Sequence, residues 1–199
     1  MTATAVAVVT GASGHVGANL VRALLARGQR VRALIHRDQR GLAGLDVERI
    51  EGDVGDLGSL QRAFAGADTV YHAAGMISLL RTEWRELQAT NILGTRHVVE
   101  ACRLAGVRRL VHFSSIHALV QEPLDVPVDE SRPLVCAVDG RRCPPYDRSK
   151  AVGELEIQEG LARGLDAIIL HPTAIIGPYD FKPSHLGEVL LALAKRKQR

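Results

Sequence analysis

A tyrosine and a lysine four residues apart, in the segment Tyr146-Asp147-Arg148-Ser149-Lys150, could carry out acid/base chemistry. Residues at this spacing lie on the same face of a helix, so the phenol and the ammonium are expected side by side. A nearby cation favours the phenolate, and Lys150 should therefore lower the pKa of Tyr146 toward the range of a catalyst. An exposed Tyr and Lys on an ordinary amphipathic helix would show the same spacing, so other residues must decide between the two interpretations.

A pair of serines, Ser114-Ser115, ends the apolar segment that precedes this region. The carboxyl ends of parallel strands are where ligands bind in open α/β sheets. A serine hydroxyl at such a strand end can donate a hydrogen bond to a substrate carbonyl oxygen. The alternative is an exposed strand-end serine that makes a local turn bond.

Three glycines spaced three apart, Gly11, Gly14 and Gly17, follow the apolar run 6–9 and open an apolar-periodic segment at 16–25. That order predicts a strand, a tight turn and a helix. Glycine allows the backbone to approach a ligand, and the unpaired N–H groups of a helix N-terminus favour a pyrophosphate. The spacing is one residue wider than the Gly-x-Gly-x-x-Gly fingerprint, and a Gly-rich turn of any α/β protein is the alternative. We interpret the stretch as a dinucleotide site.

Alternating strands and helices must position these groups. Strands are predicted at 6–9, 30–36, 47–51, 69–72, 109–114 and 167–170, and helices at 16–25, 59–65, 83–105, 146–163 and 184–199. This alternation predicts an α/β fold with a doubly wound parallel sheet. The long irregular region 116–145 carries five prolines and leads directly into Tyr146, which is typical of a functional or mobile loop.

The composition is that of an ordinary globular protein. The chain has 199 residues, of which 46% are hydrophobic and 24% charged, and a net charge of +3 with both signs interspersed. These values argue against disorder and against nucleic acid as a partner. The apolar runs are too short to cross a membrane, and neither the histidines nor Cys102, Cys136 and Cys143 form a metal-like set. With no leader sequence at Met1, a reduced, cytoplasmic location is expected.

The motifs taken together resemble the extended short-chain dehydrogenase/reductase superfamily, the NAD-dependent epimerase/dehydratase group. The resemblance runs from Val6 to about Lys182 and rests on TGASGHVG, Gly52-Asp53, HAAG at 72–75, Asn91, the paired serines and YDRSK. Within this superfamily the chain resembles dihydroflavonol reductase-like enzymes most. That similarity rests on Val128-Asp129-Glu130-Ser131 and on the segments His171-Pro172-Thr173 and Ile176-Gly177-Pro178. It implies a Rossmann-type NAD(P)-binding domain over residues 1–183.

The resemblance implies roles residue by residue. Tyr146 would be the general acid/base, Lys150 would bind the nicotinamide ribose and tune Tyr146, Ser115 rather than Ser114 would hold the substrate oxygen, and Asn91 would support the site. The cofactor would be bound by Gly11, Ser13, Gly14, His15, Val16, Gly17, His36, Arg37, Asp53, Val54, Ala73, Ala74, Gly75, Tyr146, Lys150, Pro172 and Thr173. The resemblance also suggests a homodimer through the long helix and the catalytic helix.

The end of the second strand bears on the choice of cofactor. An acidic residue there would bind the ribose hydroxyls of NAD, whereas a basic one would meet the 2′-phosphate of NADP. The strand runs into His36-Arg37, with Asp38 one step further. NADP(H) is therefore preferred, with Arg37 as its ligand. NAD(H) is the alternative if Asp38 occupies the strand end.

Two departures from the family pattern concern the reaction. Ser115 is followed by Ile116-His117 rather than by the Asp-Glu pair of sugar dehydratases, and the Val-Tyr-Gly segment of many epimerases is replaced by Ala118-Leu119-Val120. Both departures favour carbonyl/alcohol redox on a small organic substrate. His117 could line a pocket.

Members of the family continue past the Gly-Pro motif into a substrate lobe, so the resemblance implies that this lobe is largely absent and that 184–199 is a C-terminal helix, which could be the start of a truncated lobe. The chain would then be either a fragment or a short cofactor-binding form. A nucleotide-sugar epimerase and a non-catalytic NAD(P)-binding regulatory protein remain as alternatives.

Overall fold

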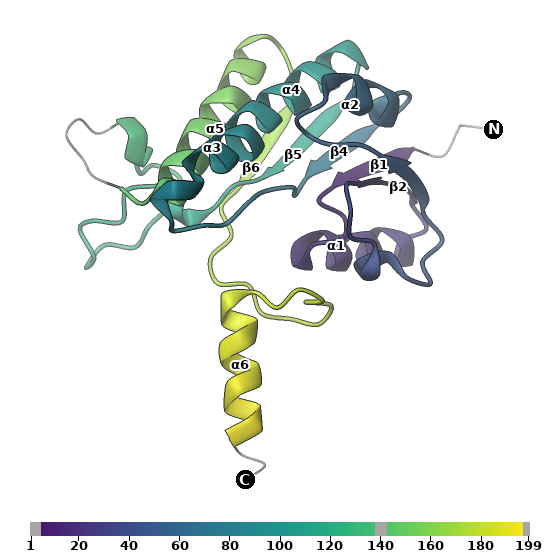
Figure 1. Ribbon diagram of the computed structural model, residues 1–199. Coiled ribbons are helices and arrows are strands. Elements are labelled where there is room, and N and C mark those ends of the chain that lie inside the picture. Colours follow the sequence, from purple (N-terminus) through teal and green to yellow (C-terminus); the bar gives the residue numbers. More distant parts are fainter. Residues whose placement is uncertain (1–4, 138–142, 197–199) are drawn as a thin grey trace.

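Six parallel strands form a single sheet in the computed structural model, which describes residues 5–137 and 143–196 (Figure 1). The strand order is β3-β2-β1-β4-β5-β6, so the direction of winding reverses between β1 and β4. Ligands in such sheets bind at this switch point, beyond the carboxyl ends of the strands. The strands are β1 Val6–Thr10, β2 Arg30–Ile35, β3 Glu48–Glu51, β4 Thr69–His72, β5 Arg109–Phe113 and β6 Ala167–Leu170.

Helices cover both faces of the sheet, as the doubly wound prediction requires (Figure 1). Successive residues of β1 point to opposite faces, and Val9 packs with the core under α1 whereas Val8 packs with the core under α2, α4 and α5. The helices are α1 His15–Ala26, α2 Leu57–Phe64, α3 Trp84–Leu87, α4 Gly94–Leu104, α5 Pro145–Ala162 and α6 His185–Arg196. The predicted Rossmann-type architecture is confirmed.

The predicted long helix 83–105 is wrong as one continuous element. It is divided into a 3-10 turn at Arg81–Glu83, α3, a π-helical turn at Gln88–Leu93, and α4. The π turn contains Asn91, whose carbonyl oxygen would lie 2.5 Å from a Cβ placed on Gly153 of α5. The two helix backbones approach each other closely at this point, and the apolar periodicity of the sequence does not reveal such a contact between distant segments.

The catalytic-motif helix α5 buries an unusual face. Pro145 stands in its first turn, where a missing N–H costs nothing, and Tyr146 follows at once. Its buried residues are mostly polar or small, namely Ser149, Lys150, Ala151, Gly153, Glu154, Ile157 and Gly160. An ordinary amphipathic helix would bury an apolar stripe instead.

The region between β5 and α5 is mostly irregular, as predicted. Its described residues hold two short 3-10 turns, Ile116–Ala118 and Val135–Ala137, and an isolated bridge between Leu119 and Leu134. Residues 138–142 of the predicted loop lie outside the described residues, as do residues 197–199 at the predicted basic end of the last helix.

The segment after β6 leaves the sheet, and α6 stands away from the other helices (Figure 1). Asn19 of α1 donates a hydrogen bond to the Pro178 carbonyl over 2.8 Å, and the guanidinium of Arg22 lies 3.8 Å from the ring centre of Tyr179. Within the described parts of the chain, none of the helices combines the length and hydrophobicity needed to cross a membrane.

Candidate active site

The glycine loop between β1 and α1 is packed too closely for side chains. Gly11 has a φ of 65°, and a Cβ there would lie 2.5 Å from the Ala74 backbone nitrogen. A Cβ on Gly17 would lie 2.1 Å from the Gly11 carbonyl oxygen. Both glycines are therefore required by backbone contacts that the sequence pattern alone could only suggest.

The N-terminus of α1 is free to bind an anion. Gly14 is its N-cap residue, and no side chain caps the N–H groups of the first turn. The Gly14 N–H donates to the Gly11 carbonyl over 3.0 Å, which fixes the turn in front of the helix. These N–H groups and the helix dipole suit a pyrophosphate.

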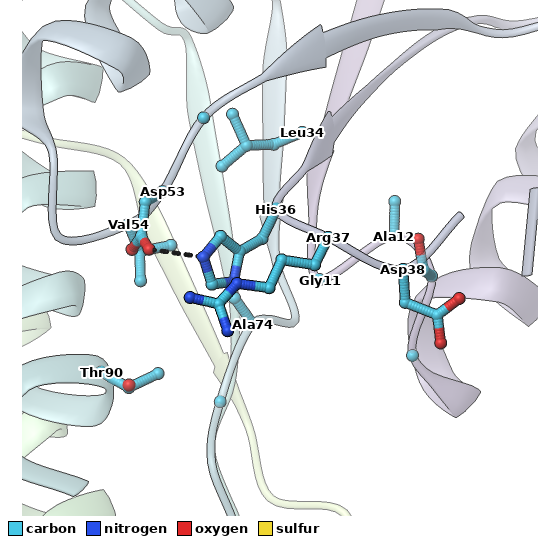
Figure 2. A pocket seen from close by; sticks show the side chains of 14 residues that line it. Gly11, Ala12, Leu34, His36, Arg37, Asp38, Asp53, Val54, Ala74 and Thr90 are labelled. Carbon is cyan, nitrogen blue, oxygen red and sulfur yellow. Dashed lines mark ion pairs between the residues drawn. The ribbon is translucent and has the colours of Figure 1, made fainter. Parts of the chain in front are cut away.

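A cleft of about 340 Å³ opens beside this loop (Figure 2). It brings together nine of the predicted cofactor residues, namely Gly11, Ser13, Gly14, His36, Arg37, Asp53, Val54, Ala74 and Gly75. Five other residues also line it, namely Ala12, Leu34, Asp38, Gly52 and Thr90. Gly52 was visible in the sequence beside Asp53, whereas Leu34 and Thr90 carry no polar motif that could have marked them.

Four predicted cofactor residues lie next to the cleft rather than in its lining. Val16 and Gly17 belong to the first turn of α1, and Ala73 donates its N–H to the Thr10 carbonyl over 3.2 Å. His15 faces the segment after β6, because a Cβ on Gly177 would lie 3.6 Å from its Nε2 atom.

The strand β2 ends at Ile35, so His36 and Arg37 are the first residues beyond it. His36 Nε2 lies 3.1 Å from Asp53 Oδ2, and Arg37 lines the same cleft (Figure 2). Asp38 is held by Arg40, whose Nη2 lies 2.7 Å from Asp38 Oδ2 and whose backbone N–H donates to Oδ1 over 3.0 Å. These hydrogen bonds lower the pKa of Asp38 to about 2.

Ser115 and Tyr146 meet at the carboxyl edge of the sheet. A hydrogen bond with the Ser115 side chain lowers the pKa of Tyr146, but burial raises it by more and Asp147 raises it further. The net shift is upward, so the prediction that Tyr146 has a lowered pKa is wrong in this structure. His117 lies beside the pair, with its ring centre 6.4 Å from that of Tyr146.

Lys150, which was expected to lower the pKa of Tyr146, is directed elsewhere. Its ammonium is buried and donates a hydrogen bond to the Phe113 carbonyl over 2.7 Å. Burial lowers the pKa of Lys150 from 10.5 to about 8. The sequence spacing placed Tyr146 and Lys150 on one face correctly, but it did not reveal that Lys150 would be directed at the end of β5.

Asn91 connects the segment after β4 to α5. Its Oδ1 accepts the Met76 N–H over 2.8 Å, and its Nδ2 donates to the Met76 carbonyl over 2.9 Å and to Ser149 Oγ over 2.8 Å. The side chain is buried. Asn91 therefore positions the segment after β4 against α5.

The two remaining predicted residues follow β6. The Pro172 carbonyl accepts the Ile116 N–H over 3.1 Å, which places it beside the strand end that carries Ser115, and Thr173 is exposed. Ser114 points elsewhere, because its hydroxyl donates to Glu154 of α5. Among the described residues no cluster of three or more His, Cys, Asp or Glu side chains could hold a metal ion.

Comparisons with known proteins give the same picture. The model of the family described as "NAD dependent epimerase/dehydratase family" matches residues 7–199. The "Sterol demethylase protein B" of Methylococcus capsulatus is 43% identical over 96% of this chain and 58% of its own length. The "Putative dihydroflavonol 4-reductase" of Synechocystis is 35% identical over 95% of this chain and 54% of its own length.

A solved structure is similar over the same region. The UDP-glucose 4-epimerase of Thermus thermophilus, in complex with NAD, superposes with a TM-score of 0.76 and 28% identity over 94% of this chain and 60% of its own. The chain thus spans little more than half the length of these relatives. The fold, the glycine loop and the family match establish together that this chain belongs to the NAD-dependent epimerase/dehydratase family.

Proposed function

We propose that this chain is the cofactor-binding and catalytic part of an NADP(H)-dependent oxidoreductase that interconverts a carbonyl and an alcohol. The hydrogen bond between Ser115 and Tyr146, beside the buried Lys150, carries this proposal. The three groups lie at the carboxyl edge of the sheet, where the glycine loop also begins. A proton donor and a cofactor cradle would thus serve one reaction at this edge, although the cleft beside the glycine loop is not itself lined by Ser115, Tyr146 or Lys150.

The residues present fit a dinucleotide. The cradle around Gly11 and Gly17 leaves room for no side chain, and the first turn of α1 offers N–H groups to a pyrophosphate. Asp53 and Val54 would lie at the adenine, and Lys150 at the nicotinamide ribose. The bound cofactor would supply or accept the hydride.

Tyr146 would give the proton to the carbonyl oxygen during reduction, and Ser115 would orient that oxygen. Because burial raises the pKa of Tyr146, the phenol keeps its proton at neutral pH, as a general acid must. In the direction of alcohol oxidation Tyr146 must first lose this proton. We therefore expect the oxidation rate to rise with pH above neutrality.

The surroundings of β2 support NADP(H) over NAD(H). The carboxylate of Asp38, which could bind ribose hydroxyls, is engaged by Arg40. The guanidinium of Arg37 borders the cleft and can grip a phosphate with two hydrogen bonds.

A sugar-nucleotide epimerase is the second candidate. The similarity to the Thermus thermophilus epimerase favours it, because that enzyme is seen with NAD on the same fold. An epimerase would interconvert its substrate without net consumption of added cofactor. A regulatory protein that binds NADP(H) without turnover would use the same cleft, but it would not need the Ser115–Tyr146 contact.

Consumption of NADPH with a panel of small aldehydes and ketones tests the proposal, using the purified chain and the variant Tyr146→Phe. Loss of the phenol proton should lower turnover by about 10²- to 10⁴-fold and leave NADPH affinity nearly unchanged. Tyr71→Phe, on β4, is the matched control and should keep full activity. Turnover retained in Tyr146→Phe would refute the assigned role.

We also propose a homodimer through α4 and α5. These helices expose Leu104 and Leu155, and Arg96 and Glu156 bridge the two helices over 2.7 Å. Analytical ultracentrifugation checks the oligomeric state.

A further inference from the structure

Glu154 is a buried acidic residue for which the proposed mechanism has no use. It is 2% exposed and lies on α5, one helical turn beyond Lys150. One of its carboxylate oxygens, Oε1, accepts hydrogen bonds from two side chains, the Ser114 hydroxyl and His171 Nε2, the latter over 2.9 Å. A carboxylate this deeply buried is costly unless it is paired, so its surroundings require an explanation.

The two donors come from different elements of the site. Ser114 stands directly after β5 and next to Ser115, and His171 stands directly after β6 and next to Pro172. Glu154 therefore fixes the ends of two neighbouring strands to the helix that carries Tyr146 and Lys150. A shift of this carboxylate would move Ser115 relative to Tyr146.

The charge of Glu154 also acts on Lys150. Residues four apart on a helix are neighbours, and the only acidic group that affects the Lys150 ammonium among the described residues is Glu154. The other titratable groups around this pair come from β4, β5, the segment after β6 and the 3-10 turn before α5, and His171 among them is hydrogen-bonded to Glu154 itself. They are His72, His112, His171 and Cys136.

We propose that Glu154 is a positioning residue of the catalytic site: it holds the ends of β5 and β6 against α5 and provides the counter-charge of the Lys150 ammonium. The assignment to catalysis rests on the function proposed above. The pairing of charges does not, because it concerns the ligand-free chain.

Two opposing effects set the pKa of Lys150, and Glu154 supplies one of them. Burial lowers the pKa of Lys150 to about 8, and Glu154 opposes that shift. Without the carboxylate the pKa falls further, so Lys150 loses its charge near neutral pH. The ammonium would then be lost where the proposed reaction needs it to hold the ribose.

The variant Glu154→Gln separates charge from geometry. The amide oxygen of Gln can still accept both hydrogen bonds, whereas the negative charge is gone. The chain has four lysines, Lys150, Lys182, Lys195 and Lys197, so the signals of ¹³Cε-labelled lysine can be followed one by one by NMR. We expect the Lys150 titration to move to lower pH by about one unit or more in this variant.

Glu159→Gln is the matched control, because Glu159 lies on the same helix but forms an exposed pair with Arg163. Its Lys150 titration should equal that of the wild type. An unchanged Lys150 titration in Glu154→Gln would overturn the proposal.

A double variant covers the case in which Glu154→Gln does not fold. Lys150→Met combined with Glu154→Gln removes both charges together, which costs less than leaving one of them buried alone. The double variant should regain the circular dichroism spectrum and a cooperative thermal transition. A double variant as unfolded as Glu154→Gln would contradict the charge pairing.

Activity measurements then distinguish this proposal from the proposed function. If the wild type reduces carbonyls, the alkaline limb of kcat/KM should move to lower pH in Glu154→Gln, with rates at pH 6 nearly unchanged. A uniform loss at all pH values would show a merely structural role. If the wild type has no turnover, the proposed function fails, whereas the lysine titration still decides the pairing.

Discussion

The centre of the sheet, around β1 and β4, and its edge at β6 are built differently. Around β1 and β4, backbone lies directly against backbone, and the side chains of Val8, Val9 and Val70 are fully buried. Beyond β5, the edge strand β6 leaves Ile168 41% and Leu170 40% exposed, and Ile176 after it is 64% exposed. The backbone contacts around β1 and β4 leave no room for an added methyl group at Gly11 or Gly17, whereas the β6 edge leaves apolar surface exposed. Substitutions around β1 and β4 should therefore lower the free energy of unfolding strongly, and those beyond β6 should lower it only slightly.

Gly17→Ala should disrupt the packing of the glycine loop most strongly. The added methyl would lie 2.1 Å from the Gly11 carbonyl oxygen, so the glycine loop must move away from α1. We expect a loss of about 3 kcal/mol or more in the free energy of unfolding and no detectable NADPH binding. Urea denaturation and NADPH fluorescence measure the two effects.

Gly28→Ala is the control for this substitution. Gly28 has a φ of 72° and open space around a Cβ, so only backbone strain of about 1 kcal/mol is expected, with normal NADPH binding. Equal losses in both variants would show that packing at the loop is not special.

His72, on β4, makes the stability of the folded chain sensitive to acid. Its ring lies between Thr10 Oγ1, at 2.8 Å, and Thr95 Oγ1, at 3.1 Å, and burial lowers its pKa from 6.5 to about 3. Between these pH values the unfolded chain binds the proton and the folded chain does not. The free energy of unfolding should therefore decrease as the pH falls from 6.5 to 3, by up to about 1.4 kcal/mol per pH unit.

The variant His72→Gln removes this titration. Its free energy of unfolding, measured by urea denaturation at several pH values, should depend less steeply on pH than that of the wild type. The same slope in both proteins would contradict a buried neutral imidazole.

Leu193→Glu should have the smallest effect. Leu193 lies on α6 and is 52% exposed, so a charge there meets solvent. We expect a change within about 0.5 kcal/mol in the free energy of unfolding, whereas Leu60→Ala in the buried core should cost about 2–5 kcal/mol. A large destabilisation by Leu193→Glu would show that α6 is packed against the domain after all.

The sheet could be predicted because its signals are local. Apolar runs bounded by glycine and polar residues located all six strands. The helix predicted at 59–65 is α2, which begins two residues earlier, at Leu57, because the Asp56 side chain accepts a hydrogen bond from the Gly58 N–H and caps it there. The interruption of the helix 83–105 could not be predicted, because it depends on Gly153 and Ser149 of a helix far along the chain.

The sequence predicted which residues make up the site better than it predicted their pKa values and ion pairs. The motifs identified the residues that meet at the cleft and at the Ser115–Tyr146 contact. The raised pKa of Tyr146 and the engagement of Asp38 by Arg40 depend on burial and on side-chain direction, which spacing does not specify. Glu154 was missed although it stands four residues after Lys150, because a single glutamate on a helix carries no signal of burial.

Paired fluorescence titrations with NADPH and NADH, on the wild type and Arg37→Ala, test the central claim most directly. We predict that the wild type binds NADPH more tightly than NADH, and that Arg37→Ala loses about tenfold in NADPH affinity with NADH binding unchanged, as expected for the loss of one charged phosphate contact. Tighter binding of NADH by the wild type would contradict the assignment of Arg37. Binding of neither cofactor would contradict the dinucleotide site itself.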